Sequence, residues 1–221
     1  MSVQIGKPAP NIHVSKWVQG LQTNIDKNKG KVILVDVFQV NCPGCFMYSL
    51  PNAIEIYKNY SRDDVIVLGL ATAFEDYDKN TLENLELLLT SGQVIGDTLN
   101  AIGQYGQLIN GNQLSYKIPF PVGMDVLQKI EPNISDSYIL DFIHSNIPDY
   151  KNYPESNKKE ILGQVKQYLK NKTYSALTFE QYSLRGTPST ILIDREGILR
   201  NVSFGANNSL NGMIGALIKD E

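Results

Sequence analysis

The only two cysteines of the chain lie in one Cys42-Pro43-Gly44-Cys45 motif. Two thiols at this spacing on a helix start can close a disulfide across one turn and exchange it with the disulfides of other molecules. An apolar, β-branched run over 31–40 predicts a buried strand before the motif. Pro43 suits a first helical position, because the N–H that it lacks would have no partner there. The motif is therefore predicted to lie at a junction between a strand and a helix.

The two sulfurs differ in their positions on the predicted helix. Cys42, at or next to the N-cap, faces unpaired backbone N–H groups and the positive end of the helix dipole, which both favour a thiolate. We therefore expect Cys42 to be the attacking sulfur. Cys45 lies one turn further in, is better shielded, and is expected to be the resolving thiol that closes the disulfide.

Three other interpretations of the cysteine pair stay open. A zinc site would need four ligands, and beyond the cysteines the chain offers the histidines His13 and His144. The pair could hold an iron–sulfur cluster across a dimer, or be two ordinary buried cysteines. The strand-then-helix context favours redox chemistry over all three.

Length and charge narrow the function classes. The 221 residues can bury a sizeable core without a disulfide framework, and a net charge of −3 argues against nucleic acid as a partner. No apolar run is long enough for a membrane helix, and the start of the chain lacks the profile of a secretory signal. We expect a cytoplasmic protein, or a periplasmic one if a leader was removed.

Periodicity and turn residues predict an α/β chain with a mixed sheet. Residues 1–30 are predicted to be rich in loops, and Asn80 with Glu83 has the spacing of a capping box. The predicted elements are strands over 31–40 and 64–71, a helix from Asn80, a broken helix and loop over 92–113, an extended piece over 118–122, helices within 131–176, a hairpin over 189–204 and a closing helix over 210–218.

Several motifs together resemble the thioredoxin-like superfamily. They are Val35-Asp36-Val37-Phe38 followed by the cysteine pair, Arg185-Gly186-Thr187-Pro188-Ser189-Thr190 before a hairpin, and Lys7-Pro8-Ala9-Pro10 near the start. The last of these and the Gly186-Thr187-Pro188 form resemble the TlpA/redoxin branch of thiol–disulfide oxidoreductases. The resemblance covers about 7–75 and 177–221, and implies a three-layer fold with a central mixed β-sheet.

The resemblance also implies roles for five residues. Cys42 would be the nucleophile and Cys45 the resolving cysteine, while Asp36 matches a buried acid that assists proton transfer at the second cysteine. Pro188 matches a cis-proline beside the disulfide, and the backbone of Thr187 would bind an extended substrate. Beyond the redox-active disulfide no cofactor and no metal is expected.

The chain departs from the family pattern at three points. Asn41 stands where a tryptophan usually precedes the first cysteine. Pro51 comes one residue later than the pattern places it, which predicts an irregular turn in the first helix. The long separation of Cys45 from Pro188 predicts a helical insertion at about 131–176, within a single domain whose core spans about 7–126 and 177–221.

These features favour a thiol–disulfide oxidoreductase that reduces disulfides of proteins. Its partners would be a protein or small-molecule disulfide or dithiol and an external thiol electron donor. A peroxiredoxin-like thiol peroxidase is a second hypothesis, but it would need a hydroxyl residue three positions before the nucleophile and a proline before that. Gln39 and Phe38 stand at these positions. A third hypothesis is a non-catalytic binding module whose insertion recognises a partner.

Overall fold

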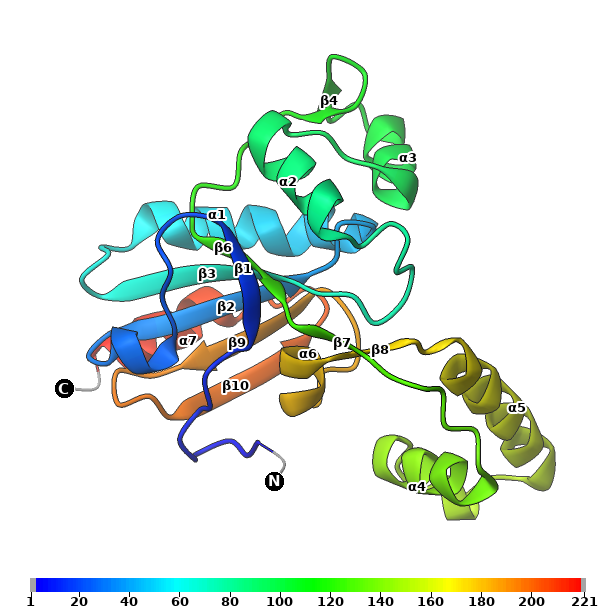
Figure 1. The fold of residues 1–221 in the computed structure, drawn as a ribbon. Helices are drawn as coiled ribbons and strands as arrows, with labels where there is room; N and C mark the ends of the chain where they lie inside the picture. The colour runs from blue at the N-terminus through cyan, green and yellow to red at the C-terminus, as the bar shows by residue number, and fades with distance from the viewer. Residues whose placement is uncertain (1–2, 220–221) are drawn as a thin grey trace. The chain divides into compact units, whose positions relative to one another are not determined.

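The computed structural model describes residues 3–219. Met1 and Ser2, the first residues of the start that lacks a signal profile, lie outside them. The core is a six-stranded sheet in the order β1-β6-β3-β2-β9-β10 (Figure 1). Its strands are β1 (Val14–Gln19), β2 (Val32–Phe38), β3 (Val65–Ala71), β6 (Val122–Asp125), β9 (Ser189–Ile193) and β10 (Leu199–Phe204).

The central strand β2 is buried at all seven positions. It pairs in parallel with β3 and antiparallel with β9, so the sheet is mixed, as predicted. Asp36 lies between Gly69 on one side and Thr190 on the other. A strand enclosed on both edges and both faces reads as an uninterrupted apolar run, and Asp36 is the exception within it.

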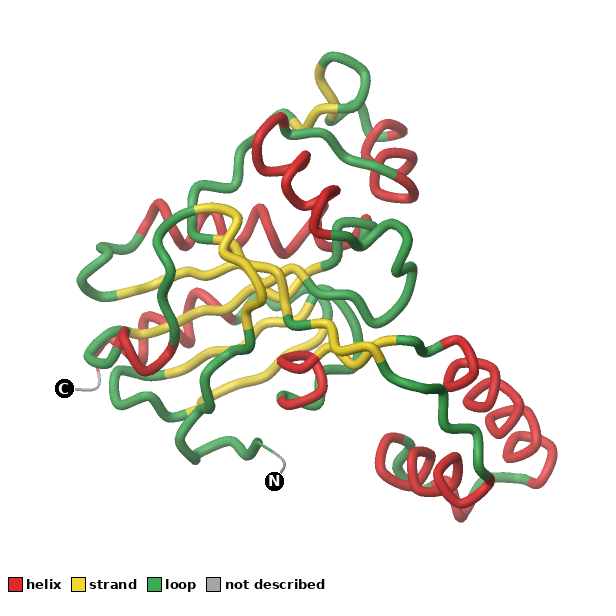
Figure 2. Tube along the Cα trace, viewed as in Figure 1, coloured by secondary structure: helices red, strands yellow, loops and turns green. Residues whose placement is uncertain are grey.

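Helices cover both faces of the sheet, which gives three layers (Figures 1 and 2). Val32, Leu34 and Phe38 point to the face packed by α1, α2, α3 and α7, while Ile33, Val35 and Val37 point to the face packed by α6 and the N-terminal segment. The helices of this unit are α1 (Leu50–Asn59), α2 (Leu82–Ser91), α3 (Gly96–Gln104), α6 (Leu177–Gln181) and α7 (Leu210–Lys219). A short hairpin of β4 (Leu108–Ile109) and β5 (Gln113–Leu114) follows α3.

The helix that carries the cysteine motif begins at Pro43 and contains a π-helical turn over Cys45–Ser49 before α1. A π-turn holds one residue more than an α-helical turn. The irregular turn predicted from the late position of Pro51 is therefore confirmed, and Pro51 falls in the first turn of α1, where proline is tolerated.

Two details of the sequence prediction are wrong. Residues 14–19, predicted as part of a loop-rich start, form the edge strand β1, whose two register irregularities blur the alternating pattern that would have revealed it. The N-cap of α2 is Thr81 rather than Asn80, because the Thr81 side chain accepts the bond from the Asn84 N–H. Asn80 is buried and serves another purpose, described below.

The chain divides into two compact units, of which the second spans residues 128–175. It holds α4 (Asp136–Asn146) and α5 (Glu155–Asn171), whose contact buries Ile139, Ile143 and Leu169 around Tyr150. The chain leaves and rejoins the first unit through the paired strands β7 (Leu127–Lys129) and β8 (Tyr174–Ala176). The helical content predicted for 131–176 is confirmed, and the assignment of one domain with an insertion stays a prediction.

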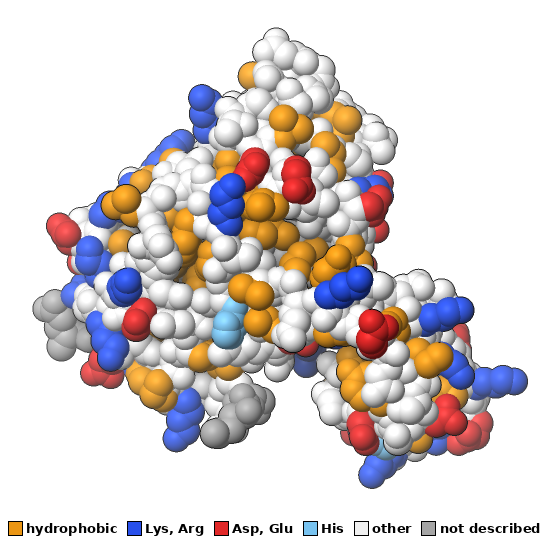
Figure 3. Space-filling view, viewed as in Figure 1, with side chains coloured by type: hydrophobic (Ala, Val, Ile, Leu, Met, Phe, Trp, Pro, Cys, Tyr) orange, Lys and Arg blue, Asp and Glu red, His pale blue; other side chains and the backbone are white. Residues whose placement is uncertain are grey.

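Charged side chains of both signs are interspersed on the face drawn in Figure 3. This mixture fits the small net charge of −3. Among the helices of residues 3–219, none is both long and apolar enough to traverse a bilayer.

Candidate active site

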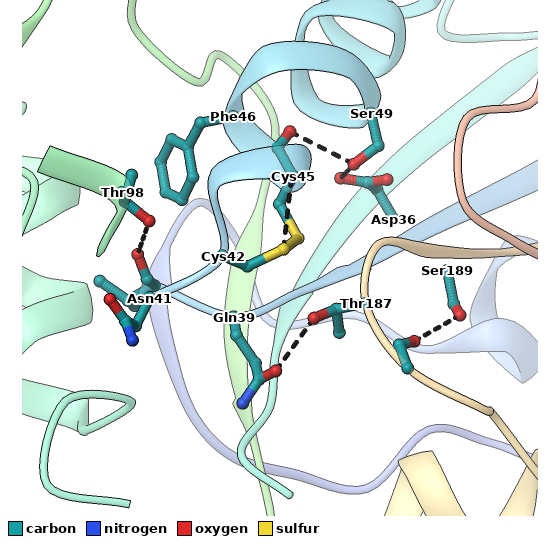
Figure 4. The surroundings of a disulfide bond; sticks show 12 residues. Asp36, Gln39, Asn41, Cys42, Cys45, Phe46, Ser49, Thr98, Thr187 and Ser189 are labelled. Carbon is teal, nitrogen blue, oxygen red and sulfur yellow. Dashed lines mark hydrogen bonds between the residues drawn. A yellow bond between two sulfur atoms is a disulfide. The ribbon is translucent and has the colours of Figure 1, made fainter. Parts of the chain in front are cut away.

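Cys42 and Cys45 are joined as a disulfide at the start of the helix that follows β2 (Figure 4). The Cys45 N–H donates to the Cys42 Sγ at 3.3 Å, so the first sulfur receives a backbone donor at the helix N-terminus. Cys42 keeps 9% of its surface exposed, whereas Cys45 keeps none. Of the two cysteines, Cys42 is therefore the one with surface open to another molecule, while the roles predicted for the two sulfurs stay predictions.

Asp36 lies beneath this helix, fully buried, on the face of β2 that packs against α1. Ser49 links the acid to the motif, since its Oγ lies 3.4 Å from Asp36 Oδ2 and 3.4 Å from the Cys45 carbonyl (Figure 4). The other carboxylate oxygen, Oδ1, has no hydrogen-bond partner among the described residues. Burial raises the pKa of Asp36 to about 7, and the bond from Ser49 offsets part of the increase.

The loop before β9 lies against the disulfide motif. The Thr187–Pro188 peptide bond is cis. A Cβ placed on Gly44 would lie 3.7 Å from Cδ of Pro188, which puts the proline in van der Waals reach of the motif. The Thr187 hydroxyl donates to Gln39 Oε1 at 3.0 Å. The fold thus brings the five predicted site residues to one place, although their chemical roles stay predictions.

Asn41, the residue before Cys42, forms hydrogen bonds with two segments that lie further along the chain. Its backbone N–H donates to Asn80 Oδ1 at 2.8 Å, and its side-chain Nδ2 donates to Asp76 Oδ2 at 2.8 Å. Its Oδ1 accepts the Asp97 N–H at 2.7 Å, at the first turn of α3. Ile95, the N-cap of α3, makes no side-chain cap bond, so Asn41 caps this helix from another part of the chain.

The Asn41 side chain fits because residue 96 is glycine. A Cβ at Gly96 would lie 2.3 Å from Asn41 Oδ1, closer than a real Cβ contact comes, and the backbone there has φ +54°. Thr98 adds a further link, donating from Oγ1 to the Val40 carbonyl at 2.9 Å. The start of α3 and the loop that carries Cys42 are therefore held as one polar cluster.

Sequence reasoning missed the residues that support the site. From the sequence, Gln39 was noted only as a departure from the peroxidase pattern. Asn41 was noted only because it stands where a tryptophan is usual. Ser49 and Asn80 had no predicted place in the site. The available signal was weak: each is a polar residue beside a predicted buried element. Their partners lie up to 148 residues away along the chain, so spacing alone could not identify them.

Metal ligands are not gathered around the cysteines. In residues 3–219, no three His, Cys, Asp or Glu side chains are grouped so that they could hold a metal ion. The groups that the site does offer are two sulfurs, one buried carboxyl and hydrogen-bonding side chains. These are sufficient for electron-pair and proton transfer at sulfur.

Comparison with solved structures identifies the architecture. No protein-family model matches the sequence, and no curated protein matches it significantly. A thioredoxin-like superfamily protein superposes with a TM-score of 0.59, 24% sequence identity and 97% coverage of each chain. A thiol-disulfide isomerase from Corynebacterium glutamicum superposes with a TM-score of 0.60, 25% identity and 98% coverage of each chain.

The chain therefore has a thioredoxin-like fold, and the solved structures that share it include a protein described as a thiol-disulfide isomerase. The fold predicted from the motifs is confirmed. The assignment to the TlpA/redoxin branch rests on the sequence motifs alone.

Replacing Gly96 with alanine should destabilise the protein by about 1–3 kcal/mol. The new Cβ would meet Asn41 Oδ1 and occupy a left-handed backbone conformation. Urea unfolding measures the change. Gly212→Ala is the matched control, because a Cβ at this position in α7 meets nothing within 4 Å; it should leave stability unchanged or raise it by up to about 1 kcal/mol. Equal stability of Gly96→Ala and the natural protein would contradict this account.

Stability should fall as pH rises from about 4 to about 7, because of Asp36. Its pKa is raised from 3.8 to about 7 in the folded state, so the folded protein keeps a proton that the unfolded chain releases over this range. Asp36→Asn should therefore stabilise the oxidised protein at pH 8 by an amount on the order of a few kcal/mol, and very little at pH 4.

Urea unfolding of the oxidised protein at both pH values measures this difference. The control is Asp78→Asn, at an acid that the fold leaves exposed, where no burial penalty is removed and no stabilisation of several kcal/mol at pH 8 is expected. An Asp36→Asn effect of the same size at both pH values would show that the charge of this carboxyl is not penalised in the fold.

Proposed function

We propose that this protein is a thiol–disulfide oxidoreductase that reduces disulfides of proteins through the Cys42–Cys45 pair. The observation that carries the proposal is the asymmetry of the pair. Cys42, at a helix N-terminus, keeps 9% of its surface exposed and its sulfur receives a backbone N–H, whereas Cys45, one turn further in, is fully buried. Beside them lie a buried carboxyl and the Thr187–Pro188 loop.

In the reduced protein, the Cys42 thiolate attacks one sulfur of the substrate disulfide and releases the other as a thiolate. This forms a mixed disulfide between Cys42 and the substrate. Cys45 then loses its proton and attacks the Cys42 sulfur, which closes the disulfide and releases the second substrate thiolate. Two electrons pass from the cysteine pair to the substrate, the proton of Cys45 passes to a base beside it, and the two substrate thiolates take up protons from solvent.

Asp36 is proposed to accept the proton of Cys45. A pKa near 7 leaves the carboxyl about half ionised at neutral pH, so it can both take up and return a proton there. Ser49 acts as a positioning residue, since its hydroxyl lies between Asp36 Oδ2 and the turn that carries Cys45.

Thr187 is proposed to bind the substrate through its backbone, as an added strand at the edge of the site. Its side chain is held away by Gln39, which also donates from Nε2 to the Glu75 carbonyl at 3.3 Å. The disulfide itself is the only redox group that the proposal needs. Because the chain has no third cysteine, an external thiol must regenerate the dithiol.

The peroxidase hypothesis gains no support from the site. Gln39 lies three positions before Cys42, is nearly fully buried and accepts the Thr187 hydroxyl, so it offers no hydroxyl group to a peroxide. A binding module would need neither cysteine, so the cysteine variants also separate that hypothesis from the proposed one.

Cys42→Ser should abolish the reduction of insulin disulfides by dithiothreitol, since the attacking thiolate is lost. Cys45→Ser should also stop turnover, but it should leave the substrate attached to Cys42 as a stable mixed disulfide. Turbidity of reduced insulin measures the first effect, and a mass increase under non-reducing conditions measures the second.

Gly44→Ala is the control variant, because its Cβ would make only an ordinary contact with Pro188 and both sulfurs remain. It should retain most of the activity. Insulin reduction at the natural rate by Cys42→Ser would refute the oxidoreductase. Retention of partner binding by a Cys42→Ser/Cys45→Ser double variant, in a natural protein without insulin reductase activity, would favour the binding module.

A further inference from the structure

A cavity adjoins the Thr187–Pro188 loop on the face of the sheet that α6 covers. It has a volume of about 430 Å³ and lies between the N-terminal segment, the turn over 182–185 and β10. The N-terminal segment runs beside β10 here, since the Gly6 N–H donates to the Leu199 carbonyl at 2.8 Å (Figure 1). Neither cysteine is among the described lining residues, so the cavity is separate from the sulfur chemistry.

The cavity is lined mainly by apolar side chains. They are Val3, Ile5, Leu184, Leu199, Val202 and Phe204. Leu184 and Leu199 are buried, whereas Ile5 and Phe204 keep 62% and 60% of their surfaces exposed. Two large apolar side chains that stay this exposed at one cavity are typical of a binding surface. The volume also falls within the range of about 300–1,000 Å³ that is usual for ligand sites.

Phe204 packs against the loop that is proposed to bind the substrate. A Cβ on Gly186 would lie 2.6 Å from Phe204 Cε2, so a larger residue at this position would displace the ring. The Gly205 N–H donates to the Pro188 carbonyl at 2.8 Å, which holds the end of β10 against the same loop. The exposed ring is therefore fixed in place directly beside Thr187.

Arg185 adds a positive charge to the cavity. Its side chain is exposed and lines the cavity, and within residues 3–219 it forms no ion pair. The described lining contains no acidic side chain. A guanidinium binds a carboxylate through two parallel hydrogen bonds. The cavity is therefore complementary to an apolar side chain that has a carboxylate next to it.

A substrate segment bound at Thr187 would reach this cavity. Arg185 is two residues from Thr187, so their Cα atoms are at most about 7 Å apart. An extended segment that pairs with the Thr187 backbone and continues along Gly186 therefore passes Phe204 and Arg185. When a peptide adds a strand to a protein, its main-chain bonds supply affinity and pockets for its side chains supply specificity.

We propose that this cavity is a specificity subsite, which accepts a large apolar side chain of the protein substrate while Arg185 pairs with an adjacent acidic side chain. This inference rests on the proposed function, in which Thr187 holds the segment that carries the substrate disulfide. Phe204 and Arg185 bind the substrate and take no part in the transfer of electrons. The preferred substrates are protein disulfides whose cysteine is flanked by an apolar and an acidic residue.

Disulfide-linked peptide dimers test this preference. Each peptide carries one cysteine in an alanine–serine background, with a Leu-Glu pair one to three residues to either side of it. The placement reduced with the highest kcat/KM, with dithiothreitol as the donor, identifies the register. At this placement, Leu-Glu should exceed Ser-Glu about tenfold in kcat/KM and Leu-Lys about threefold. Equal kcat/KM for the three peptides at every placement would refute the subsite.

Two substitutions separate the two contacts. Phe204→Ser should lower the Leu-Glu to Ser-Glu ratio from about ten to near one. Arg185→Glu should reverse the preference for Leu-Glu over Leu-Lys, and Arg185→Lys should keep it. The matched controls are Tyr105→Ser and Lys58→Glu, at an exposed aromatic and an exposed cation that do not line the cavity, and both should keep both ratios.

A natural Leu-Glu to Ser-Glu ratio in Phe204→Ser would show that the cavity does not select the side chain. A natural preference for Leu-Glu over Leu-Lys in Arg185→Glu would show that the cation does not select the carboxylate. Either result overturns the proposal. Arg185→Glu changes an exposed side chain, so it decides the question if Phe204→Ser does not fold.

Carbon-13 NMR of the oxidised protein measures the subsite without any need for turnover. A Leu-Glu peptide with serine in place of its cysteine should shift the ring signals of Phe204, which are assigned by their loss in Phe204→Ser. The Ser-Glu analogue should not shift them, and equal shifts with both would overturn the subsite. If no peptide dimer and no insulin is reduced while the Leu-Glu shift is present, the proposed function is wrong and the binding pocket stands.

Sedimentation tests a second copy of the chain as the occupant of the cavity. The natural protein and Phe204→Ser should sediment with the same mass. A natural dimer that becomes a monomer in Phe204→Ser would assign the cavity to contact between copies and overturn the proposal.

Discussion

The complete burial of β2 is the constraint from which the site follows. A strand enclosed on both faces leaves no solvent for the polar groups at its end, so those groups must find partners within the protein. At the end of β2, the partners come from three remote segments: the 75–80 loop, the start of α3 and the loop before β9. The chain around the disulfide is thus held in place by the same polar groups that satisfy the buried end of β2.

At Asp36, the burial of β2 lowers the stability of the protein. A carboxyl between two sheet neighbours and under a helix is penalised whenever it is charged, and its pKa near 7 expresses that penalty. The only described side-chain donor to it is Ser49, at a long 3.4 Å. An isolated buried acid is a poor structural element but a suitable proton acceptor at neutral pH, which is the compromise expected where stability and reactivity compete.

The central strands, the hairpin and the closing helix were predictable because each has a strong local pattern. The irregular turn before Pro51 was predictable too, since an extra residue in a helix must be accommodated somewhere. The edge strand β1 was not predicted, because its register irregularities interrupt the alternation of inward and outward side chains that marks a strand. The polar cluster around Asn41 was not predicted for a different reason. Asp76, Asn80 and Asp97 come into contact with Asn41 only through tertiary folding, so no local sequence pattern indicates these contacts.

The second unit departs and returns at one place. Around the β7–β8 pair, the Ile130 N–H donates to the Thr173 carbonyl and the Leu177 N–H donates to the Val126 carbonyl. Paired strands are about 5 Å apart, so the two ends of the 128–175 unit could be bridged by a tight turn of a few residues. A chain in which a tight turn replaces the segment between β7 and β8 would lose α4 and α5 together. It would keep every residue of the disulfide site.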